Sequence, residues 1–303
     1  MPEGYTHLRC ATKALTLSGE NVAYSNLFLA GANGADAFFA YKAWRTYSQL
    51  YPMADLGQKL HTQKVNAFLT AMLNHAVTDV QKSYVLGFLT HYALDSLAHP
   101  YVTYLCQSEN APYSMKKGHN FYETALDSTL YKKDSGKNCI PVNLSTPPVY
   151  GYQLGEICAL LRDCIFEVFG EQVPFLALTE SFHDFRFVRK FFRSPYGIKK
   201  AFAKVIELPL IAKRGFLTSR MQPMRLKRNL PNEWVNTYTN ERNEGGMGTL
   251  IKVAERTGAA YMKAACAYWN GFLTIEQLNV ILGNKSYYTG LPLQDETQTA
   301  SAV

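Results

Sequence analysis

The chain has 303 residues, a net charge of +7, a charged fraction of 18% and a hydrophobic share of 47% that includes 20 Tyr and 17 Phe. This composition is that of a globular protein and excludes disorder as the default state. The longest apolar stretches, residues 26–39 and 259–273, are interrupted by Asp36 and Lys263. Both fall short of the roughly 18 apolar residues that a transmembrane helix needs, so we expect no membrane-spanning helix.

The first ten residues show no charged segment followed by an apolar one, as a secretory signal would. Cysteines are scattered, with no Cys-x-x-Cys pair, and a disulfide framework is not expected in a chain of this size without an export signal. We therefore predict a cytoplasmic protein with reduced, mostly buried thiols at Cys10, Cys106, Cys139, Cys158, Cys164 and Cys266.

Helical signals dominate the first half of the chain. A short helix is predicted over residues 5–17, followed by a Gly/Asn turn at 31–34 that brings Asp36 to the head of a helix rich in aromatic residues up to Tyr47. Apolar residues at helical spacing predict one helix over 56–77 with His61 in its first turns. The next helix is predicted to be capped at Thr78 or Asp79 and to end before Pro100.

The second half continues in the same manner. Helices are predicted over residues 119–132, 154–169, 179–192, 197–208 and 248–269, with irregular segments at 133–152 and 223–244. A last short helix opens with the capping-box pattern Thr274-Ile-Glu-Gln277. No run of period-two alternation indicates a strand. We predict an all-α fold: one multi-helix domain over 1–290, with metal-site helices in 1–133 and a basic helical part over 153–290, and a flexible tail over 291–303.

The stretch from Gly87 to Pro100 organises these predictions. His91, Asp95 and His99 recur every four residues, and such positions drift only about 40° per step around an α-helix. The other faces of this helix are apolar, so the three polar side chains should be buried, where they need a partner. A metal ion is the simplest partner. Gly87 continues the same stripe and predicts that something packs closely against it.

A second pair at helical spacing, His119 and Glu123, again combines an imidazole with a carboxylate. His7, Asp36 and His61 are single candidates upstream. Imidazole and carboxylate donors without cysteine favour zinc or another divalent first-row ion used in catalysis. The donors suffice for two or three ions, and clustered ions suit in-line attack on a phosphoester. A lone histidine is usually only hydrogen-bonded, so His75 and His183 are not counted. The eight candidate ligands are His7, Asp36, His61, His91, Asp95, His99, His119 and Glu123.

The order and spacing of these residues resemble the zinc-dependent phospholipase C superfamily, which includes secreted zinc-dependent single-strand nucleases. Residues 87–101 look like the largely uncharacterised bacterial branch of that family, and the resemblance covers roughly residues 1–130. It implies two or three zinc ions. The first would be bound by Asp36, His61, His91 and Asp95, the second by His99, His119 and Glu123, and the third by His7 and a bridging Asp95.

The resemblance also implies a reaction: hydrolysis of a phosphodiester by metal-activated hydroxide, with Asp36 as the general base. Asp127 is expected to support the ligands rather than bind metal. Two features differ from the secreted enzymes. Three residues separate Asp95 from His99, where those enzymes usually have five. Their N-terminal residue completes the third site, so removal of Met1 would make Pro2 a possible ligand here.

Three functions remain open at this point. A phosphoric-ester hydrolase acting on a phospholipid head group is favoured, a nuclease would use the same metals, and a non-catalytic metal-binding module could keep the scaffold. A basic segment either meets an anionic surface or is a solvated face of amphipathic helices. Between Arg186 and Arg228 it holds Arg189, Lys190, Arg193, Lys199, Lys200, Lys204, Lys213, Arg214, Arg220, Arg225 and Lys227, opposed by Glu207.

Overall fold

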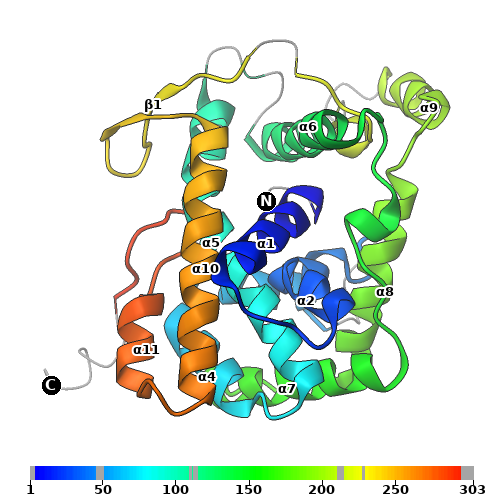
Figure 1. Ribbon diagram of the computed structural model, residues 1–303. Helices are drawn as coiled ribbons and strands as arrows, with labels where there is room; N and C mark the ends of the chain where they lie inside the picture. Colours follow the sequence, from blue (N-terminus) through cyan, green and yellow to red (C-terminus); the bar gives the residue numbers. More distant parts are fainter. Residues whose placement is uncertain are drawn as a thin grey trace, which may run out of the picture.

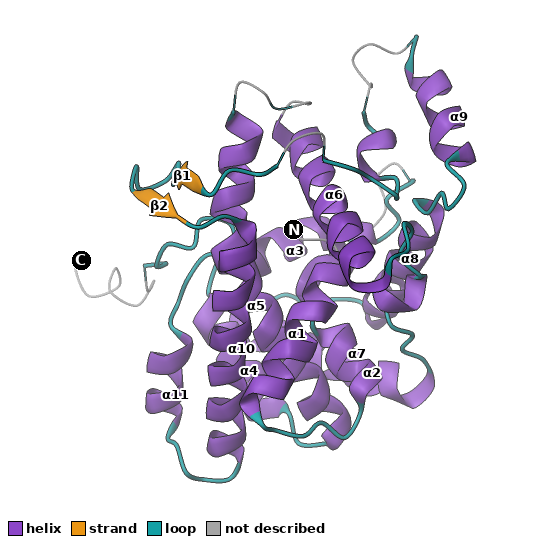
Figure 2. Cartoon of the chain, turned by 45° about the horizontal axis from the view of Figure 1, so that its top comes forward, coloured by secondary structure: helices purple, strands orange, loops and turns teal. Residues whose placement is uncertain are grey.

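The computed structural model describes residues 4–45, 51–108, 111, 115–209, 215–226 and 229–294, and over these ranges the predicted all-α fold is confirmed apart from one short hairpin (Figures 1 and 2). The α-helices are α1 (Gly4–Ser18), α2 (Ser25–Gly31), α3 (Met53–Thr62), α4 (Val65–His75), α5 (Asp79–Gln107), α6 (Met115–Ser135), α7 (Gly151–Phe169), α8 (Phe175–Phe191), α9 (Ile198–Glu207), α10 (Met247–Trp269) and α11 (Ile275–Leu282). Short 3-10 helices are η1 (Gly34–Ala40), η2 (Val142–Leu144) and η4 (Thr218–Arg220).

Helix α5 forms the centre of the molecule. The predicted cap is present at Thr78: its side chain accepts a hydrogen bond from the Gln81 backbone N–H, and the Gln81 side-chain oxygen accepts one from the Thr78 backbone N–H. Most of its residues are buried, including the whole run from Ser83 to Ser96. α10 lies alongside α5 in Figure 1, and α1 and α2 pack against other parts of it. The metal-candidate residues of α5 therefore lie in the interior.

A pair of glycines brings α2 and α5 close together. A Cβ at Gly87 would lie 1.9 Å from the Phe28 carbonyl oxygen, and a Cβ at Gly31 would lie 2.0 Å from the Tyr84 carbonyl oxygen. The two backbones thus touch where any larger residue would separate them. The predicted close packing against Gly87 is confirmed, and its partner is the backbone of α2.

The predicted end of α5 before Pro100 is wrong, because the helix continues to Gln107. Proline has no N–H, so Pro100 leaves the carbonyl of Ser96 without its helical hydrogen bond. The backbone of Gly290 packs there: a Cβ at Gly290 would lie 2.4 Å from the Ser96 oxygen and 3.6 Å from Cγ of Pro100. Packing of Gly290 on this turn therefore outweighs the tendency of Pro100 to end the helix.

The helix predicted over 56–77 is two helices. Lys64, between α3 and α4, has a φ of 47° in the left-handed region, which ends one helix before the next begins. His61 consequently lies in the last turn of α3 rather than in a first turn. The aromatic helix predicted after Asp36 is also wrong, since Asp36 lies in the short 3-10 helix η1; residues 46–50 lie outside the described ranges.

Residues 223–244, predicted to be irregular, contain a two-stranded antiparallel hairpin of β1 (Glu233–Val235) and β2 (Arg242–Glu244). Trp234 of β1 is buried, and its ring packs edge-on against Tyr101 of α5 at 5.3 Å between centroids. Three-residue strands are too short to show period-two alternation. The sequence therefore did not predict the hairpin. It did not predict α2 either, which is only seven residues long.

The remaining predicted helices are confirmed with shifted ends, and Thr274 and Gln277 form the predicted capping box of α11. Of the predicted tail, Leu293 donates to the Asn284 carbonyl, while residues 295–303 lie outside the described ranges. All six cysteines are free. Among the described residues, none of the helices combines the length and apolar character needed to cross a bilayer.

Candidate metal centre

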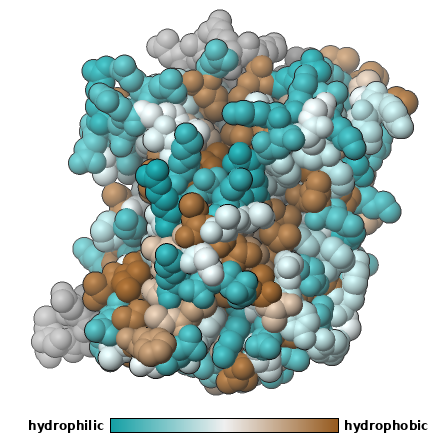
Figure 3. All heavy atoms as spheres, in the orientation of Figure 1, coloured by the Kyte–Doolittle hydropathy of each residue, from teal (hydrophilic) through white to brown (hydrophobic). Residues whose placement is uncertain are grey.

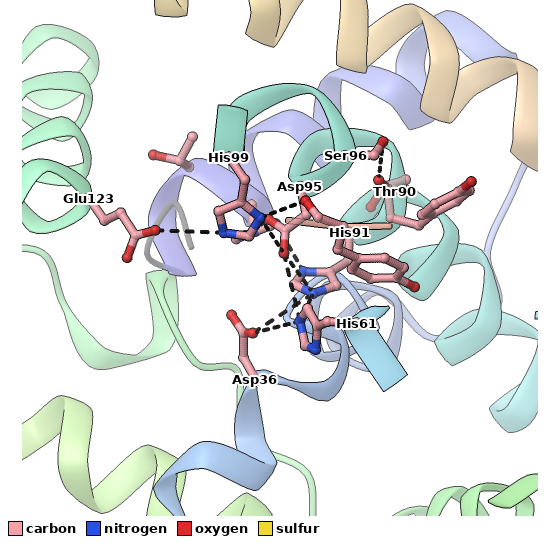
Figure 4. A network of polar contacts seen from close by, with 12 residues as sticks. Asp36, His61, Thr90, His91, Asp95, Ser96, His99 and Glu123 are labelled. Atoms are coloured by element: carbon pink, nitrogen blue, oxygen red, sulfur yellow. Dashed lines mark hydrogen bonds and ion pairs between the residues drawn. The ribbon is translucent and has the colours of Figure 1, made fainter. Parts of the chain in front are cut away.

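Five elements deliver the eight predicted donors to one region. α1 carries His7, η1 carries Asp36 and the last turn of α3 carries His61, while α5 and α6 supply the others (Figure 4). On α5 the stripe of His91, Asp95 and His99 faces these neighbours, as the four-residue spacing predicts. All eight side chains are buried except His119, whose side chain is 24% exposed.

The first donor group consists of Asp36, His61, His91 and Asp95, with ligand atoms within 4.8 Å of one another. Nε2 of His61 lies 3.5 Å from Oδ1 of Asp36. Nε2 of His91 lies 3.8 Å from the same oxygen and 3.3 Å from Oδ2 of Asp95. Two nitrogens and two carboxylates thus converge, which is the set that the family resemblance implies for the first zinc.

The second donor group consists of His99, His119 and Glu123, again within 4.8 Å. Nε2 of His119 lies 2.7 Å from Oε1 of Glu123, and Nε2 of His99 lies 3.9 Å from it. Asp95 connects the two groups, since its Oδ2 lies 3.9 Å from Nδ1 of His99 (Figure 4). The short spacing between Asp95 and His99 still brings His99 to α6.

His7 lies beside the first group. Its Nε2 is 3.2 Å from Oδ1 of Asp95, and its Nδ1 is 3.2 Å from Nδ1 of His91, where one ring donates to the other. The contact of His7 with Asp95 is compatible with the predicted third position. Pro2, its predicted companion, lies outside the described residues.

Hydrogen bonds fix two of the imidazole rings. Nδ1–H of His61 donates to the Gly57 carbonyl at 2.6 Å, and Nδ1–H of His99 donates to the Tyr287 carbonyl at 2.8 Å. Both rings therefore present Nε2 as the lone-pair atom, toward Asp36 and Glu123 respectively. Such second contacts orient a metal-binding histidine and increase its basicity.

The protonation states also suit a metal. Burial lowers the pKa of His91 to about 4 and that of His99 to about 3, so both rings are neutral at pH 7. Burial alone would raise the pKa of Asp95, but His91 and His99 outweigh it and hold that pKa well below its usual value. The pKa of Asp36 is lowered in the same way, with His91 and His61 outweighing burial. Neutral imidazoles and ionised carboxylates are the forms that bind zinc.

A direct test of fit is whether buried polar atoms here have partners. Both carboxylate oxygens of Asp36, both of Asp95, Nε2 of His7 and Nε2 of His99 are buried without a hydrogen-bond partner within the protein. Isolated buried carboxylates are costly, and these point at one another and at lone pairs of imidazoles. Bound cations would satisfy all of them, so the donor set fits zinc.

Two aromatic residues that sequence reasoning missed complete the walls. The Tyr287 ring lies 4.9 Å from that of His61 and 5.7 Å from that of His91. The Tyr288 ring lies 5.6 Å from His61 and 5.0 Å from His99, so it contacts a histidine of each donor group. Both follow α11, far from the other site residues in the sequence, and no spacing rule links them to α5.

Asp127 holds the start of α1 and is a member of neither donor group. It accepts from the backbone N–H of Tyr5 at 2.9 Å and from that of Thr6 at 2.8 Å, at the start of the helix that carries His7.

His75 is exposed and pairs with Glu167 at 2.5 Å, and the ring of His183 stacks on Tyr150. Neither histidine reaches a donor group, as expected.

Comparison with known protein families matches residues 6–155 to the model described as zinc dependent phospholipase C. The matched stretch contains all eight donors, since it runs from Thr6 past Glu123. No curated protein and no solved structure matches the chain.

Proposed function

Because the chain belongs to the zinc-dependent phospholipase C family, we propose that it is a zinc-dependent hydrolase of phosphodiesters, with phospholipid head groups as the favoured substrate. The supporting observation is the pair of buried donor groups joined through Asp95, whose oxygens reach His7 and His91 on one side and His99 on the other. Zinc ions bound there would supply Lewis-acid activation of water and stabilise charge on the phosphoryl oxygens.

The residues of the chain would orient the reactants. Asp36 is the proposed general base, because it is a buried carboxylate in the first donor group and both of its oxygens are without a hydrogen-bond partner. His119 is the partly exposed member of the donor groups, so we place the approach of the phosphoester on its side. The ring of Tyr288 contacts both groups and would exclude water between them.

Turnover can be tested with purified protein and three substrates: a chromogenic phosphodiester, a phosphatidylcholine emulsion and a single-stranded oligonucleotide. We expect hydrolysis of the first two that is abolished by a chelator and restored by zinc. Preferential cleavage of the oligonucleotide would instead assign the protein to the nuclease alternative. Bound zinc with no turnover on any phosphoester would make it a non-catalytic module.

Asp36→Asn tests the proposed base. The variant is expected to lower kcat at least about 100-fold, since a positioned base typically contributes that much or more. Asp163→Asn, at an exposed carboxylate on α7 that pairs with Arg162, is the control and should retain full activity. Equal activity of the two variants would remove Asp36 from the reaction.

A further inference from the structure

Helix α9 (Ile198–Glu207) turns its polar side toward the protein and its apolar side toward solvent, the reverse of a usual surface helix. Its residues facing the protein are Lys200, Ala203 and Glu207, and two of these are charged. Its outward side carries Ile198, Phe202, Val205 and Ile206, with exposed fractions of 46% to 72%, and Leu208 follows at 57%. α9 projects from the body at the upper right of Figures 1 and 2.

The inward face is fixed by polar contacts rather than by apolar packing. Nζ of Lys200 donates to the carbonyls of Met221 at 2.9 Å and Pro223 at 2.7 Å. Glu207 accepts from the backbone N–H of Gly215 at 3.0 Å and from the hydroxyl of Thr218 at 2.7 Å. These contacts hold α9 in one orientation, with its apolar side toward solvent.

Charge on α9 is arranged to match an anionic plane. At about 100° per residue, the apolar side chains centre on Ile198, and the exposed Lys199 and Lys204 fall on the two flanks between the apolar side and the buried side. Lysines at these positions can extend their ammonium groups to the level of lipid phosphates while their stems lie along apolar surface. In Figure 3, apolar spheres stand among hydrophilic ones at the upper right, the corner that α9 occupies in Figure 1.

Aromatic residues next to α9 extend the surface. Tyr196, two residues before the helix, is 89% exposed, and Phe191 at the end of α8 is 47% exposed. Nζ of Lys199 donates to the Phe191 carbonyl at 2.9 Å, which ties the two helices together. Tyrosine and phenylalanine are residues that settle at the boundary of lipid and water.

The basic segment predicted from the sequence thus divides into two parts. Arg186 and Arg193 donate to the carbonyls of Thr146 and Ile140, so they are structural, as is Lys200. Lys213, Arg214, Lys227 and Arg228 lie outside the described residues. Among the exposed lysines of the segment, Lys199 and Lys204 border the apolar side of α9, and Lys199 also donates to the Phe191 carbonyl.

We propose that α9 is an interfacial anchor that inserts its apolar side into the head-group region of an anionic lipid bilayer. A projecting convex helix suits a deformable plane, and the flanking lysines match anionic head groups. A second copy of the chain is disfavoured as the occupant, because a two-fold contact through this face would bring Lys199 and Lys204 close to their own copies. The acidic residue of α9, Glu207, is buried and could not offset them.

Vesicle sedimentation tests the anchor without any turnover, so its outcome is independent of the proposed hydrolysis. The full chain is mixed with phosphatidylglycerol vesicles or with phosphatidylcholine vesicles. The Phe202→Ser/Val205→Ser variant should lower partitioning onto phosphatidylglycerol by at least about tenfold. Phe272→Ser/Val280→Ser is the matched control and should bind like the wild type; it makes the same changes just before and within α11, at positions that are 80% and 83% exposed.

The charge requirement has its own pair of variants. Lys199→Gln/Lys204→Gln should weaken binding to phosphatidylglycerol by about fivefold per lysine at low salt. Lys252→Gln/Lys263→Gln, at exposed lysines of α10, should not. Equal binding by the α9 variants and their controls would overturn the proposal, as would equal binding of the wild type to both kinds of vesicle. A wild-type dimer in light scattering that Phe202→Ser/Val205→Ser dissociates would assign the face to a second copy instead.

Discussion

His91 and His99 are fully buried imidazoles on one helix, and their neutrality has a consequence for stability. Their pKa values in the folded protein, about 4 and about 3, lie below the usual histidine value of about 6.5. Between these limits the unfolded chain binds more protons than the folded one. The free energy of unfolding therefore falls as the pH is lowered through this window, and the lowered pKa values of Asp36 and Asp95 act in the same direction at more acid pH.

We accordingly expect metal-free protein to lose about 2 kcal/mol of stability per ring between pH 7 and pH 5. Chemical denaturation of chelator-treated protein at several pH values measures this loss. His99→Asn should show a smaller pH dependence than the wild type, whereas His75→Asn, at an exposed histidine, should keep the full dependence. A wild-type stability that does not change between pH 7 and 5 would contradict the buried neutral state.

Residue chemistry and helical spacing were enough to predict the candidate donors of α5 and α6, whereas the grouping of His7, Asp36 and His61 with them rested on the family resemblance. Four-residue spacing predicts which side chains share a helix face, and burial of the face follows from its apolar neighbours. Tyr287 and Tyr288 could not be predicted, because their approach to α5 depends on how the segment after α11 folds back. The hydrogen bond from His99 to the Tyr287 carbonyl spans 188 positions, and nothing local encodes it.

Among the elements, the close contact of α2 with α5 positions η1 and its donor Asp36. Gly87→Ala is expected to destabilise the protein by about 1–3 kcal/mol, because the new methyl group would overlap the Phe28 carbonyl oxygen. Gly155→Ala in α7 is the matched control: its Cβ meets nothing within 4 Å, so helix propensity alone should stabilise by up to about 1 kcal/mol. Thermal unfolding of both variants measures these changes. A Gly87→Ala variant that is as stable as Gly155→Ala would show that the backbone contact does not limit residue size at position 87.

The elements that were mispredicted have specific causes. Pro100 normally indicates a helix end, but the carbonyl that it frees faces Gly290 in the folded chain. Lys64 breaks the predicted helix by adopting a left-handed conformation, for which lysine gives no signal. The strands at Glu233–Val235 and Arg242–Glu244 are stabilised through Trp234 by packing on α5. In each case, contacts distant in sequence override a local preference.

Across the whole molecule, the region that matches the family, residues 6–155, lacks the helix that buries the apolar surface of α5. α10 packs on α5 and α1, and a Cβ at Gly258 would lie 3.3 Å from Ala14 and 3.4 Å from Thr90. A chain ending at residue 155 would expose this apolar surface of α5 and lose Tyr287 and Tyr288. We predict that it aggregates or unfolds without cooperativity in circular dichroism, while a chain ending at residue 294 folds like the full protein. Cooperative unfolding of the shorter chain would show that residues 6–155 fold independently.

The two joined donor groups are expected to bind zinc, with Asp95 shared between them. Elemental analysis of protein purified with zinc and then dialysed measures this binding. We expect at least two zinc ions per chain in the wild type and in Asp163→Asn, and less than one in Asp95→Asn. Less than one zinc per chain in the wild type, or a full complement in Asp95→Asn, would show that the two groups do not form a joined zinc site.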